Sequence, residues 1–134
     1  MNSKQLSEKI SELIFSKKGY DVKLLDLNNL TTMADYFLIC SADSDTQVKA
    51  ISDEIEKSLR DDGIKCWHRE GYKALNWVLL DYVDVVVHVF KKDSREFYNL
   101  EKLWGDAVIT EMEDPVLKAA QKKSVKRTTK KAAK

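Results

Sequence analysis

The segment from residue 77 to residue 90 constrains the fold of this chain more than any other part of the sequence. Two runs of apolar, β-branched and aromatic residues flank an Asp-x-x-Asp sequence at residues 81–84, and this arrangement predicts a β-hairpin. The second run, residues 85–90, is apolar enough to lie deep within a sheet. The chain is therefore expected to build its core around a sheet that contains this hairpin.

The first strand of the hairpin is apolar on both of its faces. Because side chains alternate across a strand, Trp77, Leu79 and Asp81 are expected on one face and Val78 and Leu80 on the other. If helices cover only one face of the sheet, the Trp and Leu side chains are exposed beside acids, as in a protein-binding hot spot. If helices cover both faces, these side chains belong to the core, and the sequence leaves both alternatives open.

Apolar residues at helical spacing predict two helices before the hairpin. The first covers residues 3–18 and is followed by Gly19 as a C-terminal stop. The second begins where Ser44 and Gln47 fit a capping box, and it ends before Gly63. Its buried stripe is predicted to be Val48, Ile51, Ile55 and Leu59.

A third helix is predicted after the hairpin. Asp93 and Ser94 are typical N-cap residues, and the helical spacing continues through about Trp104. The residues predicted to form its apolar stripe are Phe97, Leu100, Leu103 and Trp104.

Five strands complete the predicted fold. They are residues 22–27, 36–41 and 64–68 together with the two strands of the hairpin. The order of helices and strands predicts an α/β (α+β) fold, in which helices pack against a mixed five-stranded sheet. The strand at 36–41, the following helix and the strand at 64–68 imply a right-handed parallel crossover.

Length and charge divide the chain into one domain and a tail. With 134 residues the chain is long enough for a single core, which we assign to residues 1–114. That part carries 15 Lys and Arg against 22 Asp and Glu, whereas residues 115–134 carry 8 Lys and Arg and no acid. Residues 115–134 contain no aromatic residue and are predicted to be disordered when free.

No run is apolar enough to span a membrane and no signal peptide is apparent, so a soluble, cytoplasmic protein is expected.

The sulfur and imidazole groups are too dispersed to predict a metal centre. Cys40 and Cys66 are expected to be reduced thiols, because two cysteines are too few for a disulfide framework. A zinc site that combined them with His68 and His88 would need a ligand pair at Cys-x-x-Cys spacing, which the sequence lacks. We therefore expect neither a metal nor any other cofactor.

One short segment leaves an enzymatic alternative open. Asp43-Ser44-Asp45 has the Asp-x-Asp spacing that binds catalytic magnesium in nucleotidyltransferases, although helix capping accounts for the same residues and no Gly-Ser phosphate-binding element precedes them. His88 alternates with valines in a predicted strand and is expected to be a hydrogen-bonded sheet histidine rather than a catalyst. No nucleophile, base and orienting group can be assigned together, so no catalytic residue is predicted.

Four segments in combination resemble the ribosomal silencing factor family, also called RsfS or Iojap-like proteins. They are residues 34–41 (Ala-Asp-Tyr-Phe-Leu-Ile-Cys-Ser), the pair Glu70-Gly71, residues 77–90, and residues 100–107, which begin Leu-Glu-Lys-Leu-Trp. The resemblance covers about residues 6–107. It implies a nucleotidyltransferase-like fold without the catalytic set, and a protein that is not an enzyme.

The resemblance also implies a function and a partner. Members of the family bind the large-subunit ribosomal protein L-fourteen at the subunit interface, which blocks joining of the small subunit and represses translation under nutrient limitation. The alternatives are a magnesium-dependent nucleotidyltransferase and a generic adaptor that binds RNA through its tail, while homodimer formation by the free protein stays open. The residues expected to bind the partner are Trp77, Leu79, Asp81, Tyr82, Asp84 and His88.

The sequence departs from the family pattern at three places. Ala42 and Val83 stand where the family commonly has glycine, and because valine disfavours positive φ the hairpin turn is expected to differ in type. The third departure is the basic tail, which is expected to contact rRNA phosphates without reading sequence, with solubility as the alternative role. The tail residues assigned to RNA contact are Lys122, Lys123, Lys126, Arg127, Lys130 and Lys131.

Overall fold

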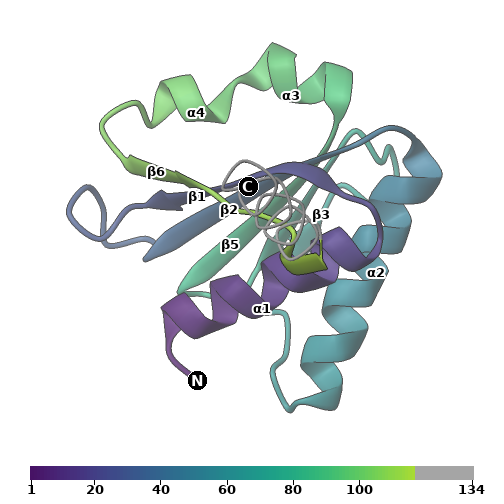
Figure 1. Cartoon of the computed structure of the whole chain (residues 1–134), viewed down its shortest axis with the longest axis horizontal. Coiled ribbons are helices and arrows are strands. Elements are labelled where there is room, and N and C mark those ends of the chain that lie inside the picture. The colour runs from purple at the N-terminus through teal and green to yellow at the C-terminus, as the bar shows by residue number, and fades with distance from the viewer. Residues whose placement is uncertain (117–134) are drawn as a thin grey trace, which may run out of the picture.

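The computed structural model describes residues 1–116, in which helices lie on both faces of a six-stranded sheet (Figure 1). The tail residues assigned to RNA contact lie outside the described residues. The helices are α1 (Ser3–Ser16), α2 (Asp45–Asp61), α3 (Lys92–Tyr98) and α4 (Leu100–Leu103). The strands are β1 (Tyr20–Asp26), β2 (Tyr36–Ala42), β3 (His68–Glu70), β4 (Trp77–Asp81), β5 (Val85–Lys91) and β6 (Val108–Glu111). In Figure 1, α1 and α2 lie below the sheet and α3 and α4 above it.

The predicted hairpin is confirmed at the centre of the fold. β4 and β5 pair antiparallel from Trp77 opposite Phe90 to Asp81 opposite Val86. β5 also pairs with β2, and these two strands run parallel. Six consecutive residues of β5 are buried, which explains why the Val-rich arm occupies the middle of the sheet order β3-β4-β5-β2-β1-β6.

The prediction of five strands is wrong, because β6 adds a sixth at the edge next to β1. All four of its residues are exposed, although Val108, Ile109 and Thr110 are β-branched residues that favour strands. The strand predicted at residues 64–68 is also misplaced, since β3 begins at His68. β3 points in the same direction as β2, yet it pairs antiparallel with β4 and lies at the other edge, with the hairpin between it and β2.

The prediction of a single helix over residues 93–104 is wrong, because the structure has two helices there. α3 starts at Lys92, its N-cap Lys91 makes no side-chain capping bond, and the helical path ends at Asn99, which has φ 44°. The Asn99 side chain then caps the short α4 by accepting a hydrogen bond from the Lys102 N–H. This break exposes two side chains of the predicted apolar stripe: Phe97 is 83% exposed and Leu103 is 73% exposed. Leu100 is buried and Trp104 packs, partly buried, beneath the same helices.

The junction between α1 and α2 follows the predicted capping with one change. The Ser44 hydroxyl accepts a hydrogen bond from the Gln47 N–H at 3.2 Å, as in a capping box. The Gln47 side chain, however, accepts from the Asp43 N–H at 2.7 Å and donates to the carbonyl oxygens of Lys17 and Lys18. Gly19 is required by packing, because a Cβ atom there would lie 2.4 Å from the Ile14 Cγ2 atom.

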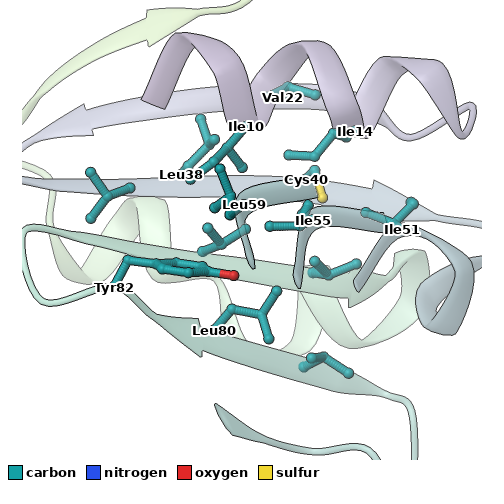
Figure 2. Packing of buried hydrophobic residues seen from close by; sticks show 14 of the residues in the cluster. Ile10, Ile14, Val22, Leu38, Cys40, Ile51, Ile55, Leu59, Leu80 and Tyr82 are labelled. Atoms are coloured by element: carbon teal, nitrogen blue, oxygen red, sulfur yellow. The ribbon is translucent and has the colours of Figure 1, made fainter. Parts of the chain in front are cut away.

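Most of the core lies between the sheet and the helices α1 and α2 (Figure 2). The predicted stripe of α2 is buried there in full, which confirms that prediction. Burial of large aliphatic side chains at roughly 25 cal/mol per Å² of apolar area is the main stabilising term of such a core. Side chains that meet in this cluster include Ile10, Ile14, Leu38, Cys40, Val48, Ile51, Ile55, Leu59 and Leu80.

A buried arginine anchors α3 to the sheet face that lies opposite α1 and α2. Arg95 is 6% exposed and donates hydrogen bonds to the Ser41 hydroxyl at 2.9 Å and to the Asp21 carbonyl oxygen. It also forms an ion pair with Glu101 of the α4 segment at 3.0 Å. Because a buried guanidinium needs such partners, this network fixes where α3 and α4 lie on the sheet. Among the described residues, no helix is long and apolar enough to cross a membrane.

Candidate protein-docking surface

The face of the sheet opposite α1 and α2 carries most of the side chains that are predicted to meet a partner. Val78 and Leu80 are fully buried against the two long helices, whereas Trp77, Leu79 and Asp81 are only partly buried and point the other way. The predicted alternation along β4 is therefore confirmed. How much of this face is free for a partner depends on the cover that α3 and α4 provide.

Trp77 lies under α3 and is not an exposed hot spot. Its ring packs against Phe90, with centroids 4.9 Å apart, and against Tyr98 of α3 at 4.7 Å. Its indole N–H donates a hydrogen bond to the His88 Nδ1 atom at 3.0 Å. At this end of the sheet, helices therefore cover both faces. Of the two alternatives that the sequence left open, the one in which Trp77 is covered is correct here, because α3 lies over it.

His88 is a buried structural histidine. It is 3% exposed, and burial lowers its pKa to about 3. It is therefore neutral at physiological pH, with Nδ1 as the acceptor from Trp77 and the proton on Nε2. The Nε2 atom is buried and has no partner among the described residues. Direct contact between a partner and this side chain is not supported by its burial.

Tyr82 is also predicted to bind the partner, but its burial does not support direct contact. It is 7% exposed and lies in the cluster beneath α1 and α2 (Figure 2). Residue 82 continues the alternation that turns Val78 and Leu80 toward the helices, so its ring follows them into the core. Burial raises the pKa of its hydroxyl well above the usual value, which keeps the group neutral.

A different set of apolar side chains remains exposed at the far end of β4. Met33 is 79% exposed, Trp67 is 73% exposed and Val83 is 56% exposed. Together with Asp81 these residues line an open cavity of about 360 Å³, and we call this set the docking surface. Asp84 is exposed in the same turn, so a second acid borders it.

Hydrogen bonds donated by backbone N–H groups hold the three segments of the docking surface in place. The Trp67 N–H donates to the Asp81 carbonyl oxygen at 2.8 Å, and the Val83 N–H donates to the Asp81 carboxylate at 2.7 Å. The Asp84 carbonyl oxygen accepts from the N–H groups just after Met33, those of Asp35 and Tyr36. These bonds give the exposed side chains a fixed framework.

The hairpin turn places a valine in the left-handed region. Val83 has φ 71°, a conformation that is unfavourable for a β-branched side chain. Valine therefore adopts positive φ here, and the reason given for expecting a different turn type does not hold. The hydrogen bond from its N–H to Asp81 and the pairing of Tyr82 with Val85 hold the turn in this shape.

Sequence reasoning missed Met33 and Trp67. Met33 precedes a strand, where periodicity gives no information, and Trp67 was assigned to the predicted strand 64–68 although β3 begins only at His68. The available signal was Trp67 itself, an aromatic residue in an otherwise polar run between Lys65 and Glu70. An unpaired aromatic in such a run is a candidate contact residue.

The groups weighed for metal chemistry have other partners or lie apart. Asp43 accepts a hydrogen bond from the Tyr20 hydroxyl at 2.6 Å, which raises the pKa of Tyr20 to about 12, and Asp45 pairs with Lys91 at 2.9 Å. Cys40 lies in the core under α1 and α2, whereas His88 is on the opposite face, so they cannot share one ion. Within residues 1–116 no three His, Cys, Asp or Glu side chains gather as a metal site would require.

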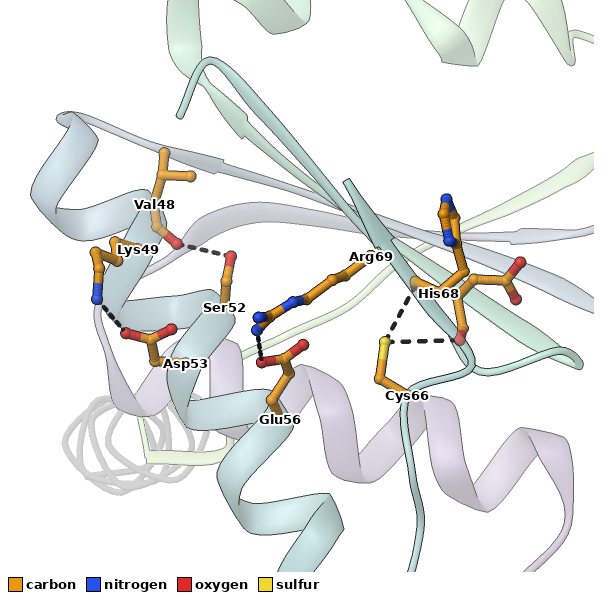
Figure 3. A network of polar contacts seen from close by, with 9 residues as sticks. Val48, Lys49, Ser52, Asp53, Glu56, Cys66, His68 and Arg69 are labelled. Carbon is orange, nitrogen blue, oxygen red and sulfur yellow. Dashed lines mark hydrogen bonds and ion pairs between the residues drawn. The ribbon is translucent and has the colours of Figure 1, made fainter. Parts of the chain in front are cut away.

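Both cysteines are free thiols. Burial raises the pKa of Cys40 to about 12, and burial also raises the pKa of Cys66. The Cys66 sulfur lies 3.2 Å from the His68 carbonyl oxygen, as Figure 3 shows. Since the thiolate is the reactive form, neither residue is primed as a nucleophile.

Comparison with known proteins gives consistent matches along the chain. A family model described as "Ribosomal silencing factor during starvation" matches residues 1–134. The Ribosomal silencing factor RsfS of Bacillus subtilis is 44% identical over 113 residues, which are 84% of this chain and 96% of that protein.

Two solved structures are also similar. A protein from Chromobacterium violaceum superposes with a TM-score of 0.76 at 34% identity, covering 78% of this chain and 88% of that one. A protein from Bacillus halodurans has a TM-score of 0.71 at 40% identity, covering 83% of this chain and all of that one. From these matches, the chain belongs to the RsfS family of ribosomal silencing factors.

Proposed function

We propose that this protein represses translation by binding the large ribosomal subunit and blocking the approach of the small subunit. The partner in this proposal is ribosomal protein L-fourteen, and the effect is expected under nutrient limitation. Membership of the RsfS family supports a role in ribosome silencing. The proposal adds two points to that role, namely the identity of the partner and the mechanism by which the small subunit is excluded.

The docking surface is the observation that carries the proposal. It combines exposed apolar side chains with Asp81 and Asp84, and the surrounding body is acidic. Apolar anchors supply most of the binding energy of a protein interface, and acids at its rim speed association with a basic partner. Ribosomal proteins are commonly basic, so the chemistry is complementary.

The mechanism needs no bond to be formed or broken. Met33 and Val83 would insert into the partner, and Asp81 and Asp84 would orient the approach by their charge. The folded body would then occupy the space that the small subunit needs. An inhibitor of this kind is expected to act before joining and to have little effect on assembled ribosomes.

Co-sedimentation with separately purified subunits tests the proposal. The full chain should bind the large subunit alone and should prevent joining when it is added before the small subunit. Met33→Ala should weaken this binding roughly tenfold, the loss typical of an interface anchor. Leu103→Ala, an equally exposed aliphatic residue on α4, serves as the matched control and should change little.

A separate variant tests how much the charge of Asp81 contributes to association. Asp81→Asn keeps an oxygen that can accept from the Val83 N–H but removes the negative charge. It should therefore slow association without disturbing the turn. Equal binding to both subunits, or a larger effect of Leu103→Ala than of Met33→Ala, would contradict the proposal. The enzymatic alternative predicts magnesium-dependent nucleotide binding in a calorimetric titration, and the proposal predicts none.

A further inference from the structure

A second cavity shares Trp67 with the docking surface. Its volume is about 480 Å³, and it is open to solvent between the end of α2 and β3. We call it the basic groove. The residues that line it are Glu56, Arg60, Lys65, Cys66, Trp67, His68 and Arg69.

The groove is positively charged within an acidic body. Three cations line it against the single acid Glu56. That acid is already paired, since Arg69 Nη1 lies 2.9 Å from its Oε2 atom, and its side chain is only 13% exposed (Figure 3). Across residues 1–116, no ion pair joins Arg60 or Lys65 to an acid, and both residues are exposed to solvent.

An exposed aromatic ring adjoins these free cations. The Trp67 side chain is 73% exposed, yet its backbone is anchored to β4 by the hydrogen bond to Asp81. The Arg69 guanidinium is held in a similar way, between Glu56 and the ring of Tyr72, whose centroid is 4.8 Å away. The groove therefore offers an exposed stacking ring on an anchored backbone, beside two unpaired charges.

Unpaired RNA is the ligand that uses both features. Its phosphates pair with lysine and arginine, and its exposed bases stack on aromatic side chains. An acidic peptide would satisfy the cations but would leave the indole without a role. We propose that the basic groove binds a single-stranded RNA segment, with phosphates at Arg60 and Lys65 and a base on Trp67.

This inference deepens the proposed function, on which it rests, by naming RNA as a second partner on the large subunit. Trp67 lines both cavities, so the protein partner and the RNA would meet at one side chain. RNA binding by the groove is nevertheless measurable without ribosomes. Failure of large-subunit binding and failure of RNA binding are thus separate results.

The test uses the full chain and a uridine decanucleotide. Binding is followed by fluorescence anisotropy of labelled RNA over a salt series, and base stacking by quenching of tryptophan fluorescence. Trp67→Ala should lower affinity roughly tenfold and abolish most of the quenching, whereas Trp67→Phe should retain much of the affinity. The Arg60→Gln, Lys65→Gln double variant should reduce the salt slope by about 1.4, at roughly 0.7 for each phosphate that is no longer neutralised.

Matched controls separate the groove from other charges and rings. Lys102→Gln on α4 removes an exposed charge far along the chain, and Phe97→Ala removes a ring that is 83% exposed. Both should leave affinity and quenching unchanged. Circular dichroism checks that each variant is folded.

Three results would overturn the inference. The first is wild-type quenching in Trp67→Ala, which would place the RNA elsewhere on the chain, such as the tail. The second is an unchanged salt slope in the double variant. The third is equally tight binding of a decaglutamate peptide that depends on Arg60 and Lys65, which would identify an acidic peptide as the ligand.

Discussion

The imidazole of His88 lies among aromatic rings, and its environment decides its state. Phe37 meets it edge-on at 4.6 Å, and Phe90 stacks at 6.3 Å. The only hydrogen bond to the ring in the described structure comes from Trp77, whose N–H is itself half-buried and needs an acceptor. The indole N–H and the imidazole Nδ1 atom therefore each supply the hydrogen-bond partner that the other needs. Trp77→Ala would leave both His88 nitrogens without a partner.

Stability should fall at mildly acidic pH because of this residue. The folded-state pKa of about 3 is below the ordinary value of 6.5, so the His88 contribution is complete above about pH 6.5 and is lost as pH falls toward 3. In that interval the unfolded chain binds a proton that the folded chain does not, at a cost of about 1.4 kcal/mol per pH unit. Urea unfolding at about pH 7 and about pH 5 measures it.

His88→Gln is the variant that isolates the effect, since glutamine does not titrate and its oxygen can accept from Trp77. The free energy of unfolding of this variant should depend less on pH than that of the wild-type chain. The same pH dependence in both proteins would mean that His88 is accessible to protons in the folded state.

The connection between β3 and β4 shows how one glycine permits an element to form. Gly71 has φ 94°, and a Cβ atom there would lie 1.9 Å from the Trp77 carbonyl oxygen. No side chain fits without moving the start of β4. The Glu70-Gly71 pair, which contributed to the family resemblance, thus has a steric reason in the chain path.

Gly71→Ala should therefore destabilise the protein by about 3 kcal/mol, because strain and a backbone clash add together. Gly63 is the matched control, since it also has positive φ (83°) but a Cβ atom at that position would have no neighbour within 4 Å. Gly63→Ala should cost only about 1 kcal/mol, the conformational term alone. Denaturant unfolding compares the two, and equal losses would show that the clash at residue 71 is relieved by relaxation.

Across the whole molecule, charge is distributed very unevenly. Residues 1–114 hold all 22 acids, and the last twenty residues hold 8 of the 23 cations. The basic groove adds a local positive region to the acidic body. The sequence of the tail and the basic groove are thus cationic, while the docking surface carries the acids Asp81 and Asp84.

Truncation after Asp114 separates these contributions. The tail should attract rRNA phosphates without selecting a site, because each neutralised phosphate releases counterions whatever the sequence. The truncated chain should keep its preference for the large subunit but show a smaller salt dependence of binding, in a salt series on isolated large subunits. Identical slopes would show that the tail does not touch rRNA, and loss of all binding would show that the body is not the recognition element.

Features that depend on neighbours along the chain were predictable from the sequence alone. The β4–β5 hairpin, the buried stripe of α2 and the Ser44 cap follow from alternation, helical spacing and capping, all of which act over a few residues. Family membership was also recognisable from short motifs in combination.

Which of these side chains are exposed was settled only by tertiary packing. The sequence left Trp77 either exposed or covered, and α3 covers it, whereas Trp67 falls within a predicted strand and is exposed where it lines two cavities. The order of the strands, the edge position of β3 and the presence of β6 were settled at the same level. The physical reason is that exposure and strand order depend on which distant elements pack together, and the break at Asn99 that places α3 and α4 leaves no mark in local periodicity.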